Sequence, residues 1–240
     1  MKKKVIILID GQNLYKTIKT MGIKEKDLDW TLIFNSIIEP DDEFIRTYWF
    51  RPEKVHELFF NEAVHTTHYL KNCDESNKEE LLQDKSKIST VLAAKIKTDF
   101  DDKTKWLGEF KQTFSQTDYK YSLISNAFED IEIVRTGYLK VDPFNKAVLT
   151  EKGVDVALAV RMVEYALTGK CDKVILFSGD FDYIEALQSV KNNMKKVHVV
   201  MLHSGTPPKN ISTSVELGFK ADKIINIYQS ELVGKYKATS

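Results

Sequence analysis

Short, continuous apolar runs constrain the fold of this chain more than any other feature. They are rich in β-branched residues and are VIILI (5–9), FIRTYWF (44–50), IEIV (131–134), KVILF (173–177) and VHVVML (197–202). Strands of a parallel sheet that is covered on both faces have such sequences, because the side chains on both faces are buried and none need be polar. A further run, KIINI (223–227), predicts a last short strand. The runs therefore predict a mainly parallel central sheet of five or six strands.

Helical periodicity lies between several of these runs. Apolar residues recur at spacings of three and four in three segments: Leu14, Ile18 and Met21; Val154, Leu158 and Met162; Ile184, Leu187 and Val190. Strands that alternate with helices favour right-handed crossovers, which place helices on both faces of the sheet. We therefore expect a three-layer α/β/α fold of the Rossmann-like kind.

Residues of about 71–130 interrupt this alternation. The segment is polar at first and then has the pattern of one or two charged helices. We interpret the chain as a single domain over residues 1–240 with a helical insertion at about 71–130. The insertion is expected to act as a lid, or as the surface through which the chain forms a homodimer or binds a partner protein.

Composition narrows the partners and the compartment. The chain has 35 basic and 35 acidic residues, so its net charge predicts no broad electrostatic attraction to nucleic acid or to a membrane. The apolar run at residues 5–9 is too short for a secretion signal, and no run has the length of a membrane span. We therefore expect no membrane partner. Cys73 and Cys171 lie far apart without metal-ligand spacing, which argues against a zinc site and a disulfide framework and fits a reducing, cytoplasmic location.

Acidic residues follow the predicted strands. Asp10 ends the first strand, Asp180 and Asp182 follow the strand at 173–177, and Asp155 opens a helix. Because ligands of parallel sheets bind beyond the carboxyl ends of the strands, these side chains are expected to converge, together with Asn13. Any one of these acids could simply cap a helix. Together they would repel one another unless a cation neutralised them, and all-oxygen ligands favour Mg²⁺ or Mn²⁺.

Three linked motifs carry a resemblance to a known family. They are IDGQNL (9–14), EKGVDVALA (151–159) and FSGDFDY (177–183), and VHVVMLHSG (197–205) and ELGFKADKIINI (216–227) follow in the same order. The chain resembles the NYN domain of LabA-like proteins, a branch of the PIN-like nucleases. The likeness covers residues 4–55 and 135–228.

The resemblance implies a PIN-like fold and a metal-dependent ribonuclease, with endonuclease action expected. The residues that it implies as metal ligands, directly or through water, are Asp10, Asp155, Asp180 and Asp182. Asn13 would orient a ligand or the scissile phosphate, and Ser178 with Gly179 would shape the turn beside that phosphate.

Isolated cations are candidates for contacts with the substrate phosphates. They are Arg51, Lys54, Lys152 and Lys209, and Lys152 matches a position that is often basic in the family. A solvated surface charge is the ordinary alternative for each of them. Many family members carry an aspartate six residues after the one matched by Asp155, where this chain has Arg161. We expect Arg161 at the margin of the cleft, where it would contact a phosphate or tether an acid.

Other readings fit the residues less well. A haloacid-dehalogenase-like phosphatase needs an acid at the position of Gln12, a TOPRIM nuclease needs a glutamate after an earlier strand, and a receiver domain is half this length. The remaining alternative is a NYN-fold protein that binds RNA or scaffolds a complex with little turnover. Retention of four mutually repelling acids favours cleavage, and unstacked RNA, either single-stranded or in loops, is the expected substrate.

Overall fold

The structure is a computed structural model that describes residues 2–207, 217 and 220–238. The chain divides into two compact units. Unit 1 comprises Met1–Arg51, Leu123–Gly137 and Gly153–Ser240, and unit 2 comprises Pro52–Ser122 and Tyr138–Lys152.

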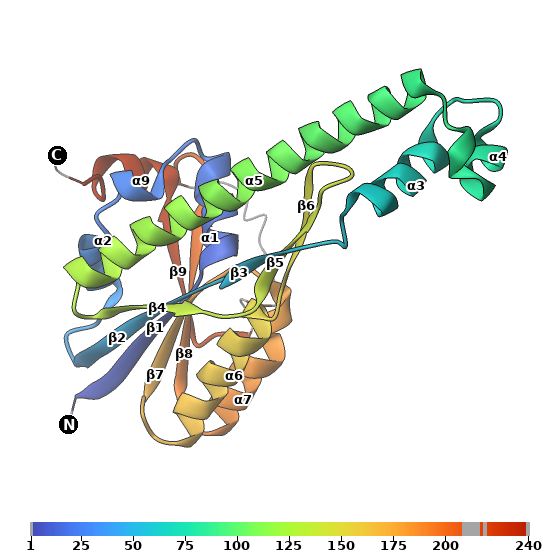
Figure 1. Ribbon diagram of the computed structural model, residues 1–240. Helices are drawn as coiled ribbons and strands as arrows, with labels where there is room; N and C mark the ends of the chain where they lie inside the picture. The colour runs from blue at the N-terminus through green and yellow to red at the C-terminus, as the bar shows by residue number, and fades with distance from the viewer. Residues whose placement is uncertain (1, 208–216, 218–219, 239–240) are drawn as a thin grey trace. The chain divides into compact units, whose positions relative to one another are not determined.

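The core of unit 1 is a six-stranded sheet in the order β4-β2-β1-β7-β8-β9, with every neighbouring pair parallel (Figure 1). Its strands are β1 (Lys3–Asp10), β2 (Asp42–Arg51), β4 (Ile131–Arg135), β7 (Lys173–Phe177), β8 (Lys196–His203) and β9 (Lys223–Tyr228). Each of the apolar runs identified in the sequence forms one of these strands. The predicted α/β fold with a mainly parallel central sheet is confirmed.

Helices cover both faces of this sheet. Among the described residues, the helices that lie wholly in unit 1 are α1 (Gly11–Thr20), α2 (Trp30–Ile37), α6 (Val154–Leu167), α7 (Ile184–Asn192) and α9 (Gln229–Gly234), with the 3-10 turns η1 (Glu25–Asp27) and η3 (Phe181–Tyr183). Leu176 of β7 joins the buried apolar cluster of α6 and α7. Its neighbour Phe177 meets Phe34 of α2 edge to face. Because successive side chains of a strand point to opposite faces, these contacts define three layers.

The strand order reverses at β1. The chain runs from β1 to β2 and β4 on one side, and then returns to β7, β8 and β9 on the other. In open α/β sheets, the crevice beyond the carboxyl ends of the strands at such a switch point is the usual ligand site. A ligand site is therefore expected at the ends of β1 and β7.

Unit 2 contains a small mixed sheet and several helices. The sheet has the order β3-β5-β6, with β3 and β5 parallel and β5 and β6 antiparallel. The elements are β3 (Lys54–Glu57), α3 (Glu62–Asn72), α4 (Lys78–Gln83), η2 (Lys85–Lys87), β5 (Tyr138–Asp142), β6 (Ala147–Lys152) and most of α5 (Thr90–Ala127).

The segment predicted as an insertion, about 71–130, is helical, and its described elements add no strand to the six-stranded sheet before Ile131. The small sheet was not predicted, because its strands are short, polar and partly exposed. The organisation as a single domain with an insertion stays a prediction. None of the described helices, the long α5 included, combines the length and the apolar character that a membrane span requires.

Candidate carboxylate site at the edge of the sheet

The four aspartates singled out in the sequence all belong to unit 1 and lie where its strand order reverses. Asp10 is the last residue of β1, and Asp180 caps η3 directly after β7. Asp182 lies within η3, and Asp155 lies in the first turn of α6. The fold thus brings to one edge of the sheet acids that are up to 172 positions apart in the chain (182 − 10).

The turn after Asp10 depends on a close approach between two strands' ends. A β-carbon on Gly11 would lie 2.4 Å from the backbone oxygen of Phe50 and 2.9 Å from Nε1 of Trp49, so only glycine fits without displacement of the backbone. This approach lets α1 begin immediately after β1. Asp10 then caps α1, and its Oδ1 accepts a hydrogen bond of 2.9 Å from the backbone N–H of Asn13.

Asp10 is the most buried member of the group, with only 2% of its surface exposed. Its Oδ2 accepts hydrogen bonds from the Ser178 hydroxyl at 3.2 Å and from the Tyr183 hydroxyl at 3.1 Å. Burial raises the pKa of the Asp10 carboxyl, and the nearby charge of Asp155 adds to the rise, while the hydrogen bonds oppose it. The protein therefore holds a carboxylate in a place that disfavours its charge.

Asp155 enters the site at the start of α6. Gly153, with φ of +83°, makes the left-handed turn into the helix. Carboxylate oxygens of Asp155 and Asp10 lie within 4.8 Å of each other. Partial burial raises the pKa of Asp155, and the charges of Asp180 and Asp182 raise it further. Asp155 is thus the acid whose charge interacts with those of Asp10, Asp180 and Asp182.

Tyr183 is the residue of this site that sequence reasoning missed. Its hydroxyl lies 3.1 Å from Oδ2 of Asp10 and 3.2 Å from Oδ1 of Asp155, and the residue is 1% exposed. Burial and the two neighbouring carboxylates raise the pKa of its phenol above the usual value, so it remains a proton donor. The only signal in the sequence was a hydroxyl-bearing residue at the end of FSGDFDY, and an apolar ring would have fitted the pattern equally well.

The turn between β7 and α7 ties the remaining residues together. Ser178 accepts a hydrogen bond of 3.1 Å from the backbone N–H of Asp180 while donating to Asp10. The backbone N–H of Gly179 donates to Oδ1 of Asn13 at 3.4 Å. Asp180 is half-buried and accepts from the N–H of Asp182 at 3.1 Å, whereas Asp182 is exposed. Asn13, Ser178 and Asp180 are thus part of one connected network.

The cations predicted to contact phosphates differ in their exposure and in the unit to which they belong. Arg51 ends β2 in unit 1 and is only 7% exposed, which leaves little of its guanidinium at the surface. Lys152 ends β6 in unit 2 and is exposed. Lys209 lies outside the described residues. An unpredicted cation, the exposed Lys16 on α1, acts on Asp155 and lowers its pKa in opposition to the acids.

The prediction that Arg161 tethers one of the acids is wrong. Its guanidinium donates a hydrogen bond of 2.9 Å to the Tyr165 hydroxyl and lies over the rings of Tyr165 and Tyr48. Its Nε is 4.0 Å from a carboxylate oxygen of Glu164. Glu164 and Tyr165 follow Arg161 on α6 by three and four residues, so the guanidinium has its partners close by on the same helix. Arg161 itself lies more than one turn after Asp155 on that helix.

A second group of acids in unit 1 shows how this chain neutralises carboxylates when it has cations to do so. Glu39, Asp41 and Asp42 have oxygens within 4.8 Å of one another at the amino-terminal end of the sheet. Nζ of the buried Lys173 lies 2.6 Å from Glu39 and 2.7 Å from Asp42, and Lys223 lies 2.7 Å from Glu39. The hydrogen bonds from Lys173 and Lys223 lower the pKa of Glu39 to about 2. This group needs no metal.

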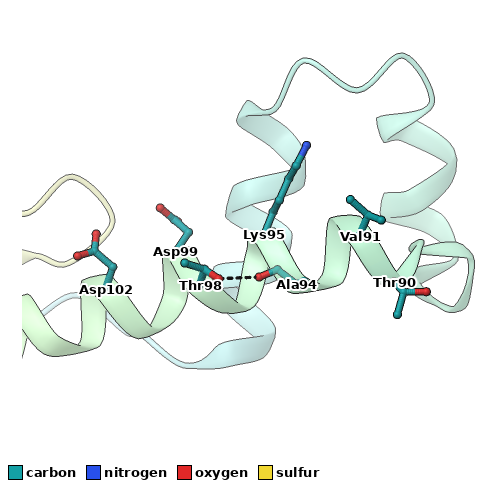
Figure 2. A pocket seen from close by; sticks show the side chains of 7 residues that line it. All are labelled: Thr90, Val91, Ala94, Lys95, Thr98, Asp99 and Asp102. Carbon is teal, nitrogen blue, oxygen red and sulfur yellow. Dashed lines mark hydrogen bonds between the residues drawn. The ribbon is translucent and has the colours of Figure 1, made fainter.

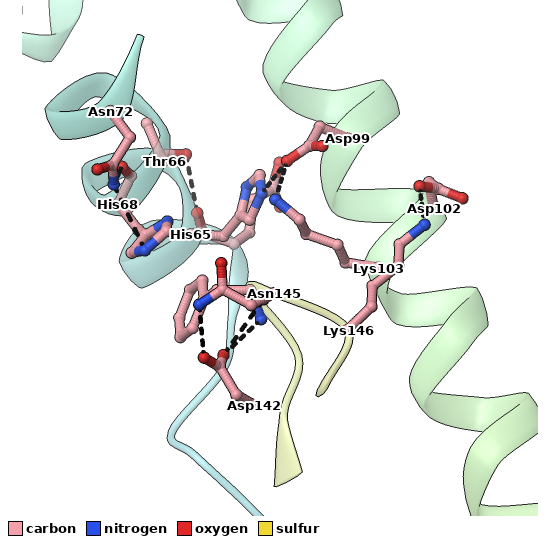
Figure 3. A network of polar contacts seen from close by, with 12 residues as sticks. His65, Thr66, His68, Asn72, Asp99, Asp102, Lys103, Asp142, Asn145 and Lys146 are labelled. Carbon is pink, nitrogen blue, oxygen red and sulfur yellow. Dashed lines mark hydrogen bonds and ion pairs between the residues drawn. The ribbon is translucent and has the colours of Figure 1, made fainter. Parts of the chain in front are cut away.

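Unit 2 offers a groove along α5, lined by Thr90, Val91, Ala94, Lys95, Thr98, Asp99 and Asp102 (Figure 2). Both acids of the groove already have partners (Figure 3). Asp99 pairs with Lys103 at 2.6 Å and with His65 at 2.7 Å, and Asp102 pairs with Lys146. The groove therefore has weaker features of a cation site than the four aspartates of unit 1.

The mainly parallel six-stranded sheet with helices on both faces is consistent with a PIN-like α/β fold. The chain belongs to the NYN domain family, whose model matches residues 4–227. The NYN domain is part of the PIN-like nuclease superfamily, whose members typically use divalent metals. A protein of unknown function from Vibrio parahaemolyticus has a similar structure, with 18% identity, 94% of this chain and 93% of that chain covered, and a TM-score of 0.48. No curated protein matches the chain.

Proposed function

We propose that this protein is a metal-dependent ribonuclease that hydrolyses phosphodiester bonds of single-stranded or looped RNA. One observation carries the proposal. Asp10 and Asp155 hold carboxylate oxygens within 4.8 Å of each other, and within unit 1 the described ion pairs involve none of the four aspartates. A pair of like charges of which one is buried and the other half-buried is costly, and a bound cation would offset that cost.

The donor set fits Mg²⁺ or Mn²⁺. Asp10, Asp155, Asp180 and Asp182 offer carboxylate oxygens, and hard divalent cations prefer such ligands. When bound, such an ion lowers the pKa of a coordinated water, polarises the phosphoryl oxygen and stabilises the leaving alkoxide. The raised pKa values of Asp10 and Asp155 indicate that the protein alone does not compensate these charges.

The other residues position the acids and the substrate. Ser178 fixes Oδ2 of Asp10, and Asn13 links α1 to the turn at Gly179. Exposed lysines such as Lys16 and Lys152 would contact phosphates of the RNA backbone, and such contacts place the substrate without reading its sequence. Both cysteines are free thiols, which agrees with work in a reducing compartment such as the cytoplasm.

Cleavage of fluorescently labelled RNA tests the proposal. We expect the purified protein to cut single-stranded and hairpin-loop RNA with Mg²⁺ or Mn²⁺, to stop when EDTA is added, and to resume when excess Mn²⁺ is restored. A DNA of the same sequence shows whether the 2′-hydroxyl matters. The Asp10→Asn protein, purified in the same way, controls for contaminating ribonucleases.

Cleavage that continues at the same rate in EDTA would mean that the metal mechanism is wrong. RNA binding without any metal-stimulated cleavage would favour the alternative, a NYN-fold protein that binds RNA or scaffolds a complex. The two outcomes are separated by measuring binding and cleavage on the same RNA.

A further inference from the structure

The hydroxyl of Tyr183 is the one neutral side-chain group that contacts both Asp10 and Asp155 in the described hydrogen-bond network of unit 1. Its distances to the two carboxylates, 3.1 and 3.2 Å, differ little. A phenol carries a single proton, so at any moment it donates to one carboxylate and lies beside the other. The two acids are thus linked through one oxygen atom.

The position of this oxygen is fixed by the packing of the ring. Tyr183 is 1% exposed and belongs to the buried apolar cluster that contains Val154 and Leu158 of α6 and Leu187 of α7. The residue ends η3, the same turn that contains Asp182 and is capped by Asp180. A ring held by α6 and α7 cannot swing away, so its hydroxyl imposes a constant spacing on the acids.

Removal of this hydroxyl would leave two neighbouring like charges, the buried Asp10 and the half-buried Asp155, with fewer hydrogen-bond donors. Asp10 would keep the Ser178 hydroxyl and the Asn13 N–H, whereas Asp155 would lose the side-chain donor described for it. Repulsion would then favour conformations of Asp155 that turn away from Asp10. A cation would have to restore the pair before it could bind, and its affinity would fall by the cost of that step.

We propose that Tyr183 is a positioning residue that holds Asp10 and Asp155 in the arrangement that a divalent cation requires. The expected effect of Tyr183 on RNA cleavage rests on the proposed function, whereas its expected effect on metal binding does not. Tyr183 itself need not touch the metal or the RNA.

The test compares Tyr183→Phe with Tyr236→Phe. Tyr236 is likewise buried, at 3% exposed, and its hydroxyl donates to Oγ of Ser36 at 2.9 Å, away from the four aspartates. Each variant loses one buried hydroxyl and keeps its ring. Mn²⁺ binding is measured by isothermal titration calorimetry, circular dichroism monitors the fold, and cleavage is measured over a series of Mn²⁺ concentrations.

We expect Tyr183→Phe to weaken Mn²⁺ binding by roughly 10- to 100-fold, the usual effect of losing a group that orients metal ligands, and Tyr236→Phe to leave it unchanged. Excess Mn²⁺ should restore most of the cleavage by Tyr183→Phe, because the ligands themselves remain. The Michaelis constant for RNA at saturating Mn²⁺ should match that of the wild type.

Unchanged Mn²⁺ affinity in Tyr183→Phe would overturn the inference, as would an equal loss in both variants. Weaker Mn²⁺ binding in Tyr183→Phe together with no RNA cleavage by the wild type would support the inference and contradict the proposed function. A wild-type protein that binds no Mn²⁺ would contradict both. Ser178→Ala provides a second variant, with a smaller loss of affinity expected, because Asp155 keeps its donor.

Discussion

Asp10→Asn is expected to abolish metal-dependent RNA cleavage while leaving the metal-free protein at least as stable as the wild type. The substitution removes a ligand charge from the centre of the network and keeps the volume of the side chain. The loss of Mn²⁺ affinity should exceed the roughly 10- to 100-fold that groups behind the ligands contribute, because Asp10 is itself a proposed ligand. The asparagine amide can still meet the hydroxyls of Ser178 and Tyr183.

The stability part of this prediction follows from the sign of the pKa shift. The pKa of Asp10 is raised in the folded protein above its ordinary value of 3.8. The folded state therefore binds more protons than the unfolded state, and stability falls as the pH rises through the unfolded pKa towards the folded one. At pH 7 the ionised carboxylate carries this cost, and asparagine does not.

Thermal unfolding in EDTA at pH 7 and at pH 4 measures the stability part. The melting temperature of Asp10→Asn should equal or exceed that of the wild type at pH 7, and the difference should shrink at pH 4. For a chain of this length each kcal/mol corresponds to about 2–4 °C. A large fall in melting temperature at pH 7 would show that Asp10 serves the fold, and full cleavage activity would show that it is not a ligand.

Asp180→Asn is expected to cost far more activity than Asp182→Asn. Asp180 is half-buried, caps η3 and is connected through its backbone N–H to Ser178, so its carboxylate has a fixed place. Asp182 is exposed, and a solvated side chain contributes less to a preorganised site. An asparagine at position 180 can still accept the N–H of Asp182, so the turn should survive.

Cleavage rates and Mn²⁺ titrations of Asp180→Asn and Asp182→Asn test this difference. We expect a loss of at least about 100-fold for Asp180→Asn, beyond the effects of groups behind the ligands, and a loss of about 10-fold or less for Asp182→Asn. Asp41→Asn, at an exposed acid of the group paired with lysines, is the control and should be fully active. Equal losses at positions 180 and 182 would show that both acids contribute as ligands.

The strands and the acids could be predicted from the sequence for the same reason. Strands buried on both faces, such as β1 and β7, contain continuous apolar runs, and their ends mark where polar side chains can converge. The positions of Asp10 and Asp180 at the edge of the sheet could therefore be predicted together with the strands. The sheet order brings β1 and β7 together, as the shared site requires.

The rest could not be predicted, because it depends on packing between distant segments. The ring of Tyr183 packs in the core, as an apolar side chain would. Only the contacts of its hydroxyl with Asp10 and Asp155 show that the residue also belongs to the site. Arg161 finds local partners in Glu164 and Tyr165, which a pattern of ligand spacing does not reveal. The strands of unit 2 are too short and too polar to stand out.

A crystal structure of the protein grown with millimolar Mn²⁺, with anomalous diffraction at the manganese edge, would show whether the four aspartates bind a divalent cation. We expect an anomalous peak whose ligands include carboxylate oxygens of Asp10 and Asp155, with Asp180 directly bound or bound through water. An ordered site with no peak among these acids would contradict this expectation. A peak at Glu39 and Asp42, with the four aspartates empty, would contradict it as well.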